Sequence, residues 1–351
     1  MNVASVRLQT LELDPAAAKE WTALAERAGN IFATWEWAST WWRHFGVGQR
    51  SFVTACRADG RLLGILPLYQ RGTRPLRILR FIGHGPGDQL GPIHAPEDRA
   101  MVTQATAELL AQTRWNIFVG EHLPAGSGWS GALGAKILAR EGSPVLHAPI
   151  GGWAAYLSTR SPNLRQQIGR RERVLAREHR VSFRLVREPD ELPAALDTLF
   201  HLHELRWPAG TSAFQPRAAF HRDFAAVALE RGWLRLWLLE LDSRPAAAWY
   251  GLRFANIEWY YQAGRDPALD DRSVGFVLLV HSIREALEEG VREYRFGRGH
   301  EPFKYRFADD DPGLETITLT RGVAARATLS AARSAYPRLK HRLGRWRWTI
   351  T

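Results

Sequence analysis

The order of strand-like and helix-like segments repeats once along the chain, and this repeat limits the possible folds more than any other feature. Residues 52–69 (FVTACRADGRLLGILPLY) and 234–254 (LRLWLLELDSRPAAAWYGLRF) both consist of two apolar runs separated by a short polar turn. Each is followed by another apolar stretch with a glycine, a helical segment and a returning strand. An offset close to half of the 351 residues is too long for a solenoid repeat and indicates a duplicated domain.

The second copy has the clearer pattern. Apolar spacing predicts helices over 189–206, 216–231 and 274–290, with Ser273 as the N-cap of the third. It predicts strands at Leu234–Leu241, Pro245–Phe254, Ile257–Ala263, Val291–Phe296 and Glu315–Thr320. A short turn of helix is predicted at 301–307, before the last strand. In the first copy the corresponding helix is 97–113, between strands at 79–83 and 115–120.

These segments predict an α/β protein in which each half is a mixed, mostly antiparallel twisted sheet flanked by helices. The expected division is an N-terminal half (1–155), a basic linking helix and strand (156–188), a C-terminal half (189–320) and a basic C-terminal helix or tail (321–351). The linking helix covers 161–178 and begins at Ser161-Pro162, which suits N-cap and N1 positions.

The net charge of +11 is concentrated in two segments. Residues 160–187 hold nine arginines against Glu172 and Glu178, and the chain from Arg321 onward holds seven arginines and Lys340 with no acid. Such segments either bind phosphates, nucleic acid or anionic lipid, or form solvated helix faces. The ending Arg345-Trp346-Arg347-Trp348 suits peripheral membrane contact, and the alternative is a tail packed on the body.

Several classes of protein are excluded. A single cysteine, Cys56, rules out internal disulfides and cysteine-rich zinc sites, and we expect it to be a small buried hydrophobe. The twelve histidines lack metal-binding spacing, and neither a P-loop nor a GxSxG motif occurs. The N-terminus lacks a secretory signal and no apolar run approaches the ~20 residues of a membrane helix, so we expect a cytoplasmic protein without a metal.

Three segments are candidate sites. The first is the start of the 274–290 helix, where DDRSVG leads in from a strand and a helix N-terminus suits a pyrophosphate. Gly275 lets phosphates approach the backbone, or simply packs against a strand. Arg265 or Arg272 can add positive charge.

The second candidate is FGRGHEPFKYRF at 296–307, because polar loops that leave strand ends commonly form sites in α/β sheets. Arg298, Glu301, Lys304 and Tyr305 supply a donor, a base, a cation and a proton donor, and Glu301, Lys304 and Tyr305 are neighbours if the turn is helical. The alternative is a surface ion pair between Glu301 and Lys304.

The third candidate is LHELRW at 202–207, where Arg206 precedes aromatic residues at a helix end and either clamps a substrate or stabilises the helix dipole. A further aromatic cluster either lines a sugar groove or fills a core, and it comprises Trp35, Trp37, Trp41 and Trp42.

The order of elements and seven motifs between residues 35 and 307 resemble the GNAT acyltransferase fold, and more narrowly its subfamily with a BioF2-like or CelD-like acetyltransferase domain. The motifs are WEWASTWWRHFG, GRLLGILPLY, LHELRW, RPAAAWYGLRF, YYQAGRDPA, SVGFVLL and FGRGHEPFKYRF. The tandem arrangement and Phe303-Lys304 are similar to those of Fem-type aminoacyltransferases. The resemblance implies two GNAT-like halves, with the acyltransferase domain in 189–320.

The resemblance implies transfer of an acyl group from acetyl-CoA or another acyl-CoA to an amine or hydroxyl of a small molecule or saccharide. The CoA site would comprise Arg272, Ser273, Val274, Gly275 and Phe276, although Val277 stands where the usual pattern has a second glycine or alanine. Lys304 would stabilise the oxyanion, Tyr305 would be the acid, and Glu301 or His300 the base. Substrate binding would involve His203, Arg206, Trp249, Tyr261, Gln262 and Arg298.

Two alternatives remain open at this point. One is a Fem-like transferase that uses aminoacyl-tRNA and binds the RNA backbone with the basic segment Arg165–Arg180. The other is a non-catalytic module associated with polysaccharide or membrane, in which tryptophan clusters and the basic tail bind.

Overall fold

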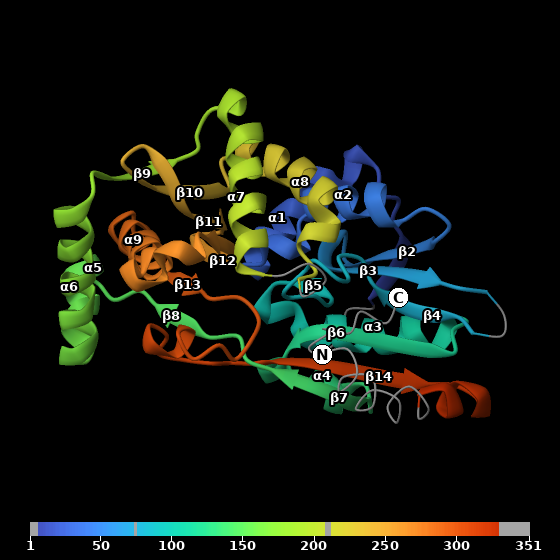
Figure 1. Cartoon of the computed structure of the whole chain (residues 1–351). Helices are drawn as coiled ribbons and strands as arrows, with labels where there is room; N and C mark the ends of the chain where they lie inside the picture. Colours follow the sequence, from blue (N-terminus) through green and yellow to red (C-terminus); the bar gives the residue numbers. More distant parts are fainter. Residues whose placement is uncertain (1–5, 74–75, 208–211, 330–351) are drawn as a thin grey trace. The chain divides into compact units, whose positions relative to one another are not determined.

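The computed structural model describes residues 6–73, 76–207 and 212–329 (Figure 1). They form two compact units. The first unit runs up to Gly142 and resumes at Pro312, whereas the second is the continuous stretch Ser143–Asp311.

The first unit contains an eight-stranded sheet with the order β1-β2-β3-β4-β6-β14-β7, in which the short β5 pairs with β3. Neighbouring strands are antiparallel except β4 and β6, which are parallel. Its elements are β1 (Arg7–Thr10), α1 (Ala18–Ala28), α2 (Trp35–Phe45), β2 (Arg50–Ala58), β3 (Arg61–Arg71), β4 (Ile78–Phe81), β5 (Ile93–His94), α3 (Arg99–Gln112), β6 (Ile117–Pro124), α4 (Trp129–Ala132), β7 (Lys136–Glu141) and β14 (Leu314–Thr320).

The second unit contains a six-stranded sheet with the order β8-β13-β12-β11-β10-β9, antiparallel except for the parallel pair β12–β13. Its elements are β8 (Val145–His147), α5 (Gly152–Thr159), α6 (Pro162–Glu178), β9 (Val181–Leu185), α7 (Leu192–Arg206), α8 (Ala218–Glu230), β10 (Leu234–Leu241), β11 (Arg244–Phe254), β12 (Ile257–Arg265), α9 (Val274–Glu288) and β13 (Glu293–Arg295).

The predicted repeat is confirmed by the topology of the two sheets. In each unit a helix, α3 or α9, comes after four antiparallel strands and before a strand parallel to the fourth, and in the first unit the short β5 lies between β4 and α3. The sheets are mixed, mostly antiparallel and flanked by helices, as predicted. The hairpins also match, because Asp59-Gly60 and Asp242-Ser243 both adopt left-handed backbone conformations, which suit two-residue turns.

The unit boundaries differ from the ranges expected from the sequence. The strand predicted at Glu315–Thr320 is β14, which pairs with β6 and β7 of the first unit (Figure 1). Residues 162–178 are not a separate linker, because α6 buries Leu164, Ile168 and Leu175 in the core of the second unit. Strand partners are decided by which sheet edge is available, and the order of elements along the chain does not reveal that edge.

Other expectations concern burial. Trp37 and Trp41 are fully buried in the first unit and Cys56 is buried in β2, so the core interpretation holds for these residues. Burial raises the pKa of the Cys56 thiol to about 12. Helical residues follow β14 at 323–329, while the rest of the predicted tail, including Arg345–Trp348, lies outside the described residues. No helix in the described ranges is long and apolar enough to cross a bilayer.

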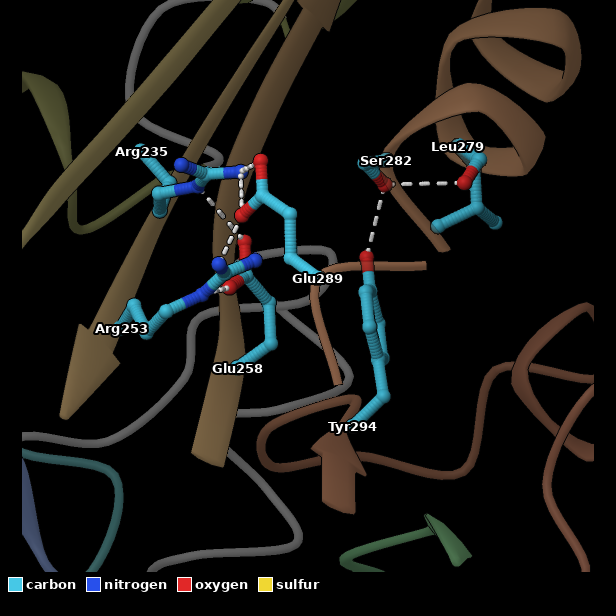
Figure 2. Close-up of polar contacts among 7 residues, drawn as sticks. All are labelled: Arg235, Arg253, Glu258, Leu279, Ser282, Glu289 and Tyr294. Carbon is cyan, nitrogen blue, oxygen red and sulfur yellow. Dashed lines mark hydrogen bonds and ion pairs between the residues drawn. The ribbon is translucent and has the colours of Figure 1, made fainter. Parts of the chain in front are cut away.

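Helix α9 is the centre of the second unit's core on one face of the sheet. Its buried residues Val277, Val280 and Ile283 pack with Trp237 and Trp249 of the sheet. At mid-helix, the hydroxyl groups of Ser282 and Tyr294 are 2.9 Å apart and hydrogen-bonded, which ties α9 to β13 (Figure 2).

A buried ionic network fixes the C-terminal end of α9. Glu258 on β12 is 0% exposed. Its carboxylate accepts a 2.6 Å hydrogen bond from Nε of Arg253 on β11, and its Oε1 lies 3.4 Å from Nε of Arg235 on β10. Both arginines also pair with Glu289, the residue that follows α9 (Figure 2). Three strands and the end of one helix are therefore joined by two carboxylates and two guanidinium groups.

The other face of the sheet carries an aromatic cluster with a buried histidine. His203 of α7 is 1% exposed, and its ring centroid lies 5.0 Å from that of Phe214, which also contacts Tyr250. Burial, together with the nearby charge of Arg206, lowers the pKa of His203 to about 4, although a hydrogen bond with Gln262 opposes the shift.

Replacing Glu258 by leucine should destabilise the second unit strongly. The substitution leaves Arg235 and Arg253 with only one carboxylate in a largely desolvated site, and breaking such a network costs about 3–5 kcal/mol. Urea unfolding followed by circular dichroism measures this loss. The matched control is Asp197→Ala, which removes the exposed pair with Arg222 and should change stability by less than about 1 kcal/mol. Equal effects of both variants would contradict the network's structural role.

Stability should fall as the pH decreases from about 6.5 to about 4. In the unfolded chain His203 takes up a proton near pH 6.5, whereas in the folded protein its pKa is about 4. Below pH 4 this difference lowers the free energy of unfolding by about 3 kcal/mol relative to neutral pH. Urea midpoints measured across this range should show a smaller decrease for His203→Gln than for wild type. The control His201→Gln alters an exposed histidine of the same helix, and its curve should follow wild type.

Candidate functional site

A cavity of about 310 Å³ opens in the second unit beyond the point where β12 and β13 stop pairing. The parallel ladder joins Ile257–Trp259 to Glu293–Arg295 and then ends. Ligands commonly bind beyond the carboxyl ends of such strands. The cavity is lined by Arg206, Ala247, Ala248, Trp249, Tyr260, Ala263, Gly264, Arg265, Asp270, Ser273, Gly275, Phe276, Leu278, Leu279 and Phe303.

Small residues on adjacent strands make room for this cavity. Atoms of Ala247 and Ala248 of β11 line the cavity together with atoms of Ala263 and Gly264 of β12. Gly264 is also required by packing, because a Cβ there would lie 2.4 Å from the backbone nitrogen of His203. The run RPAAAWYG is the sequence signal for this space, since alanines and glycines inside a strand often mark a close approach.

A β-bulge interrupts β12 next to the cavity. Tyr250 of β11 lies opposite Gln262 and Gly251 lies opposite Tyr260, so Tyr261 is the extra residue of the bulge. Tyr260 borders the cavity, and burial raises the pKa of its hydroxyl, an effect that Arg206 partly offsets. Tyr260 was not predicted, because a bulge depends on strand register and leaves no sequence signature.

The first turn of α9 borders the cavity as expected. Ser273 has a left-handed backbone, and its carbonyl accepts the first hydrogen bonds of the helix from the amides of Phe276 and Val277. The amides of Val274 and Gly275 come before these donors in the chain. They belong to the first N–H groups of the helix, which have no carbonyl partner within it. Ser273 is the N-cap residue, as predicted, but its side chain forms no capping hydrogen bond, and its φ of 57° differs from the extended backbone usual at this position.

The predicted cofactor residues divide into two groups. Ser273, Gly275 and Phe276 line the cavity, whereas the side chain of Val274 is fully buried. Arg272 does not line it, because its guanidinium pairs with Glu178 at 2.7 Å and with Asp271 at 2.9 Å.

Two other arginines lie at the cavity. Arg206 is the last residue of α7, and Arg265 is the last residue of β12. Arg265 forms a bidentate ion pair with Asp270, with distances of 2.6 and 3.0 Å. A Cβ on Gly275 would lie 3.0 Å from Cδ of Arg265, so the glycine leaves space for the arginine stem.

The remaining predicted substrate residues lie mainly elsewhere. Trp249 lines the cavity. His203 lies in the aromatic cluster instead, where it is hydrogen-bonded to Gln262. Tyr261 belongs to the same cluster through its contact with Phe214. The side chain of Arg298 is half-buried, and its carbonyl accepts a 2.8 Å hydrogen bond from Nζ of Lys304.

The 296–307 segment holds a buried ammonium group. Lys304 is 4% exposed and pairs with Glu301 at 2.9 Å. Helical geometry is confined to a single 3-10 turn at Lys304–Arg306, yet the expected proximity of Glu301 and Lys304 is present. Gly299 makes this possible at a φ of 121°, because a Cβ there would lie 2.3 Å from the Glu301 carboxylate. The pair is thus half-buried rather than superficial.

His300 and Tyr305 form a second, more exposed group. The Tyr305 hydroxyl donates to Asp311 at 2.7 Å and lies 3.0 Å from Nδ1 of His300. Desolvation and the Asp311 carboxylate raise the pKa of Tyr305 to about 12. None of the four predicted catalytic side chains lines the cavity, and the residue of this segment that does is Phe303, with its ring centroid 6.2 Å from that of Tyr260.

The equivalent helix of the first unit has an acidic N-cap residue. Asp98, the N-cap of α3, is buried and forms ion pairs with Arg61 at 2.6 and 2.9 Å. The first turns of α3 and α9 both lack acidic residues, and the difference lies at the N-cap, which is Asp98 in α3 and Ser273 in α9. The Asp98 carboxylate already occupies the positive end of the helix dipole of α3, whereas the N-cap of α9 carries no charge. Among the described residues, no group of three or more His, Cys, Asp and Glu side chains is arranged to hold a metal.

Comparison with known proteins agrees with this architecture. Residues 162–305 match the model of the Acetyltransferase (GNAT) domain family. Among curated proteins no sequence matches the chain.

Solved structures share the fold at low identity. FemX has a TM-score of 0.62 and 11% identity, with 90% of this chain and 97% of that chain covered. L-PGS from Bacillus licheniformis has a TM-score of 0.57 and 12% identity, with 95% and 98% covered. A tandem GNAT protein from the clavulanic acid biosynthesis pathway has a TM-score of 0.50 and 13% identity, with 91% and 99% covered. Residues 162–305 therefore form a GNAT domain, and the chain shares the fold of FemX and of the tandem GNAT protein.

Proposed function

We propose that the second unit transfers an acyl group from acetyl-CoA or another acyl-CoA to an amine or hydroxyl of a small-molecule or saccharide acceptor. The observation that carries this proposal is the cavity at the start of α9, where free helix amides, Gly275 and two arginines border one apolar space. A BioF2-like or CelD-like subfamily and a cytoplasmic location remain predictions from the sequence.

The donor's pyrophosphate would lie at the start of α9. The amides of Val274 and Gly275 and the helix dipole favour an anion there, and the nearby Asp270 carboxylate is paired with Arg265. Val277, which replaces a second glycine of the usual pattern, is 2% exposed and packs into the core. Its side chain therefore takes no space from the cavity.

The apolar part of the cavity suits the pantetheine arm and the acyl group. Ala247, Ala263 and Leu278 provide apolar walls around the place where the thioester carbonyl would lie. The acceptor nucleophile would attack this carbonyl carbon directly, and the thiolate of CoA would leave and take up a proton.

The 296–307 segment would supply proton transfer and support. Tyr305, with a pKa of about 12, stays protonated at neutral pH, which is the form that donates a proton to the leaving thiolate. His300 or Glu301 would take the proton of the acceptor. Lys304 would stabilise the oxyanion, or position Phe303 against Tyr260 through its bonds to Glu301 and Arg298.

A second candidate function uses aminoacyl-tRNA as the donor. Four arginines lie on the exposed side of α6, opposite the residues it buries: Arg165, Arg170, Arg173 and Arg177. The strip contains no exposed large apolar residue that would favour a membrane, so an RNA backbone is the polyanion that suits it best.

Calorimetry with acetyl-CoA tests the main proposal. Wild type should bind it in the micromolar range, and Gly275→Glu should weaken binding at least roughly tenfold, because its carboxylate repels the pyrophosphate and displaces Arg265. The control Ala219→Glu adds the same charge at an exposed position of α8 and should leave binding unchanged. A folded wild type that does not bind acetyl-CoA would refute the proposal.

Filter binding with unfractionated tRNA separates the two functions. If acyl-CoA is the donor, Arg170→Gln/Arg173→Gln/Arg177→Gln should bind acetyl-CoA as wild type does, and tRNA binding should be weak. If aminoacyl-tRNA is the donor, wild type should bind tRNA strongly, and the triple variant should lower the slope of log K against log salt by roughly 2.

A further inference from the structure

Arg265 extends from the end of β12 across the first turn of α9. If Gly275 had a Cβ atom, that atom would lie 3.0 Å from Cδ of Arg265. The arginine stem therefore lies directly over the start of the helix. Its guanidinium is held by both oxygens of Asp270, which belongs to the 3-10 segment that leads into α9. The arginine is therefore close to the unpaired helix amides but is turned to a carboxylate.

The ion pair is open to solvent and can exchange partners. The side chains of Arg265 and Asp270 are 30% and 49% exposed, and exposed ion pairs of this kind are weak. The pairing raises the pKa of Arg265 and lowers that of Asp270, and the nearby Arg206 lowers the pKa of Asp270 further. A more highly charged anion at the same place competes well with one carboxylate.

Arg272 is in a different position. The sequence pattern favours it as the phosphate ligand, yet it pairs with Glu178 of α6 and with Asp271, and it does not line the cavity. Binding an anion with Arg272 would break its ion pairs with Glu178 and Asp271, whereas binding with Arg265 breaks only the exposed pair with Asp270.

We propose that Arg265 is the residue that recognises the donor's diphosphate, and that Asp270 competes with the diphosphate for it. The inference rests on the proposed acyl-CoA function. In the structure Asp270 holds Arg265 over Gly275. When the donor binds, its diphosphate takes the guanidinium from Asp270 while the helix amides bind the same group.

The test measures binding of acetyl-CoA by calorimetry to wild type, Asp270→Asn, Arg265→Met and the double variant. The control is Asp271→Asn, which removes the neighbouring acid that pairs with Arg272. S-acetylpantetheine serves as a second probe, because it carries the same thioester arm but no diphosphate. Far-ultraviolet circular dichroism confirms that each variant is folded, and Arg265→Gln replaces Arg265→Met if the latter unfolds.

We expect Asp270→Asn to tighten acetyl-CoA binding roughly three- to tenfold and Arg265→Met to weaken it roughly tenfold. The double variant should match Arg265→Met within roughly twofold, because Asp270 acts only through Arg265. Asp271→Asn should match wild type, and binding of S-acetylpantetheine should be the same in all variants.

Equal tightening by Asp270→Asn in both backgrounds would overturn the inference, because Asp270 would then act by simple repulsion. An Arg265→Met variant that binds like wild type would overturn it as well. Both results leave the acyl-CoA function intact. A wild type that binds no acetyl-CoA would refute the proposed function itself, and the inference would fall with it.

Discussion

The position of α9 depends on the buried carboxylate of Glu258. A charge at 0% exposure is stable only with close partners, and Arg235 and Arg253 supply them from two neighbouring strands. Because the same arginines bind Glu289, the C-terminal end of α9 is joined to three strands at once. The helix is further fixed by Ser282 and Tyr294, and its other end can therefore meet the cavity in a defined orientation.

The two units share one topology but differ in the charge at the start of the equivalent helix. Both place a helix between the fourth strand and a parallel strand. In the first unit the helix starts with Asp98, buried against Arg61, and an anion there would meet a carboxylate. In the second unit the helix starts with Val274 and Gly275. The proposed donor site lies in the second unit because of these local charges, since the shared fold alone does not decide function.

The 296–311 segment illustrates how burial changes the meaning of a motif. Lys304 has the residue type expected of an oxyanion ligand, but it is 4% exposed and bonds to Glu301 and to the carbonyl of Arg298. Such an ammonium holds a loop in one conformation. The neighbouring Phe303 lines the cavity and Lys304 does not, so of the two roles proposed for Lys304 the indirect one, through Phe303, is the one that the cavity lining supports.

The sequence by itself determined the α/β class, the duplicated order of elements, the hairpin turns and the glycine at the start of α9, because these depend on local periodicity and turn chemistry. Only the tertiary structure decided that β14 returns to the first unit, that Tyr260 borders the cavity beside a bulge, and that Arg265 rather than Arg272 lies over Gly275. Those features depend on strand register and on which charged side chains meet across the fold. Such contacts join residues that are distant in the sequence, and a pattern read along one chain does not contain them.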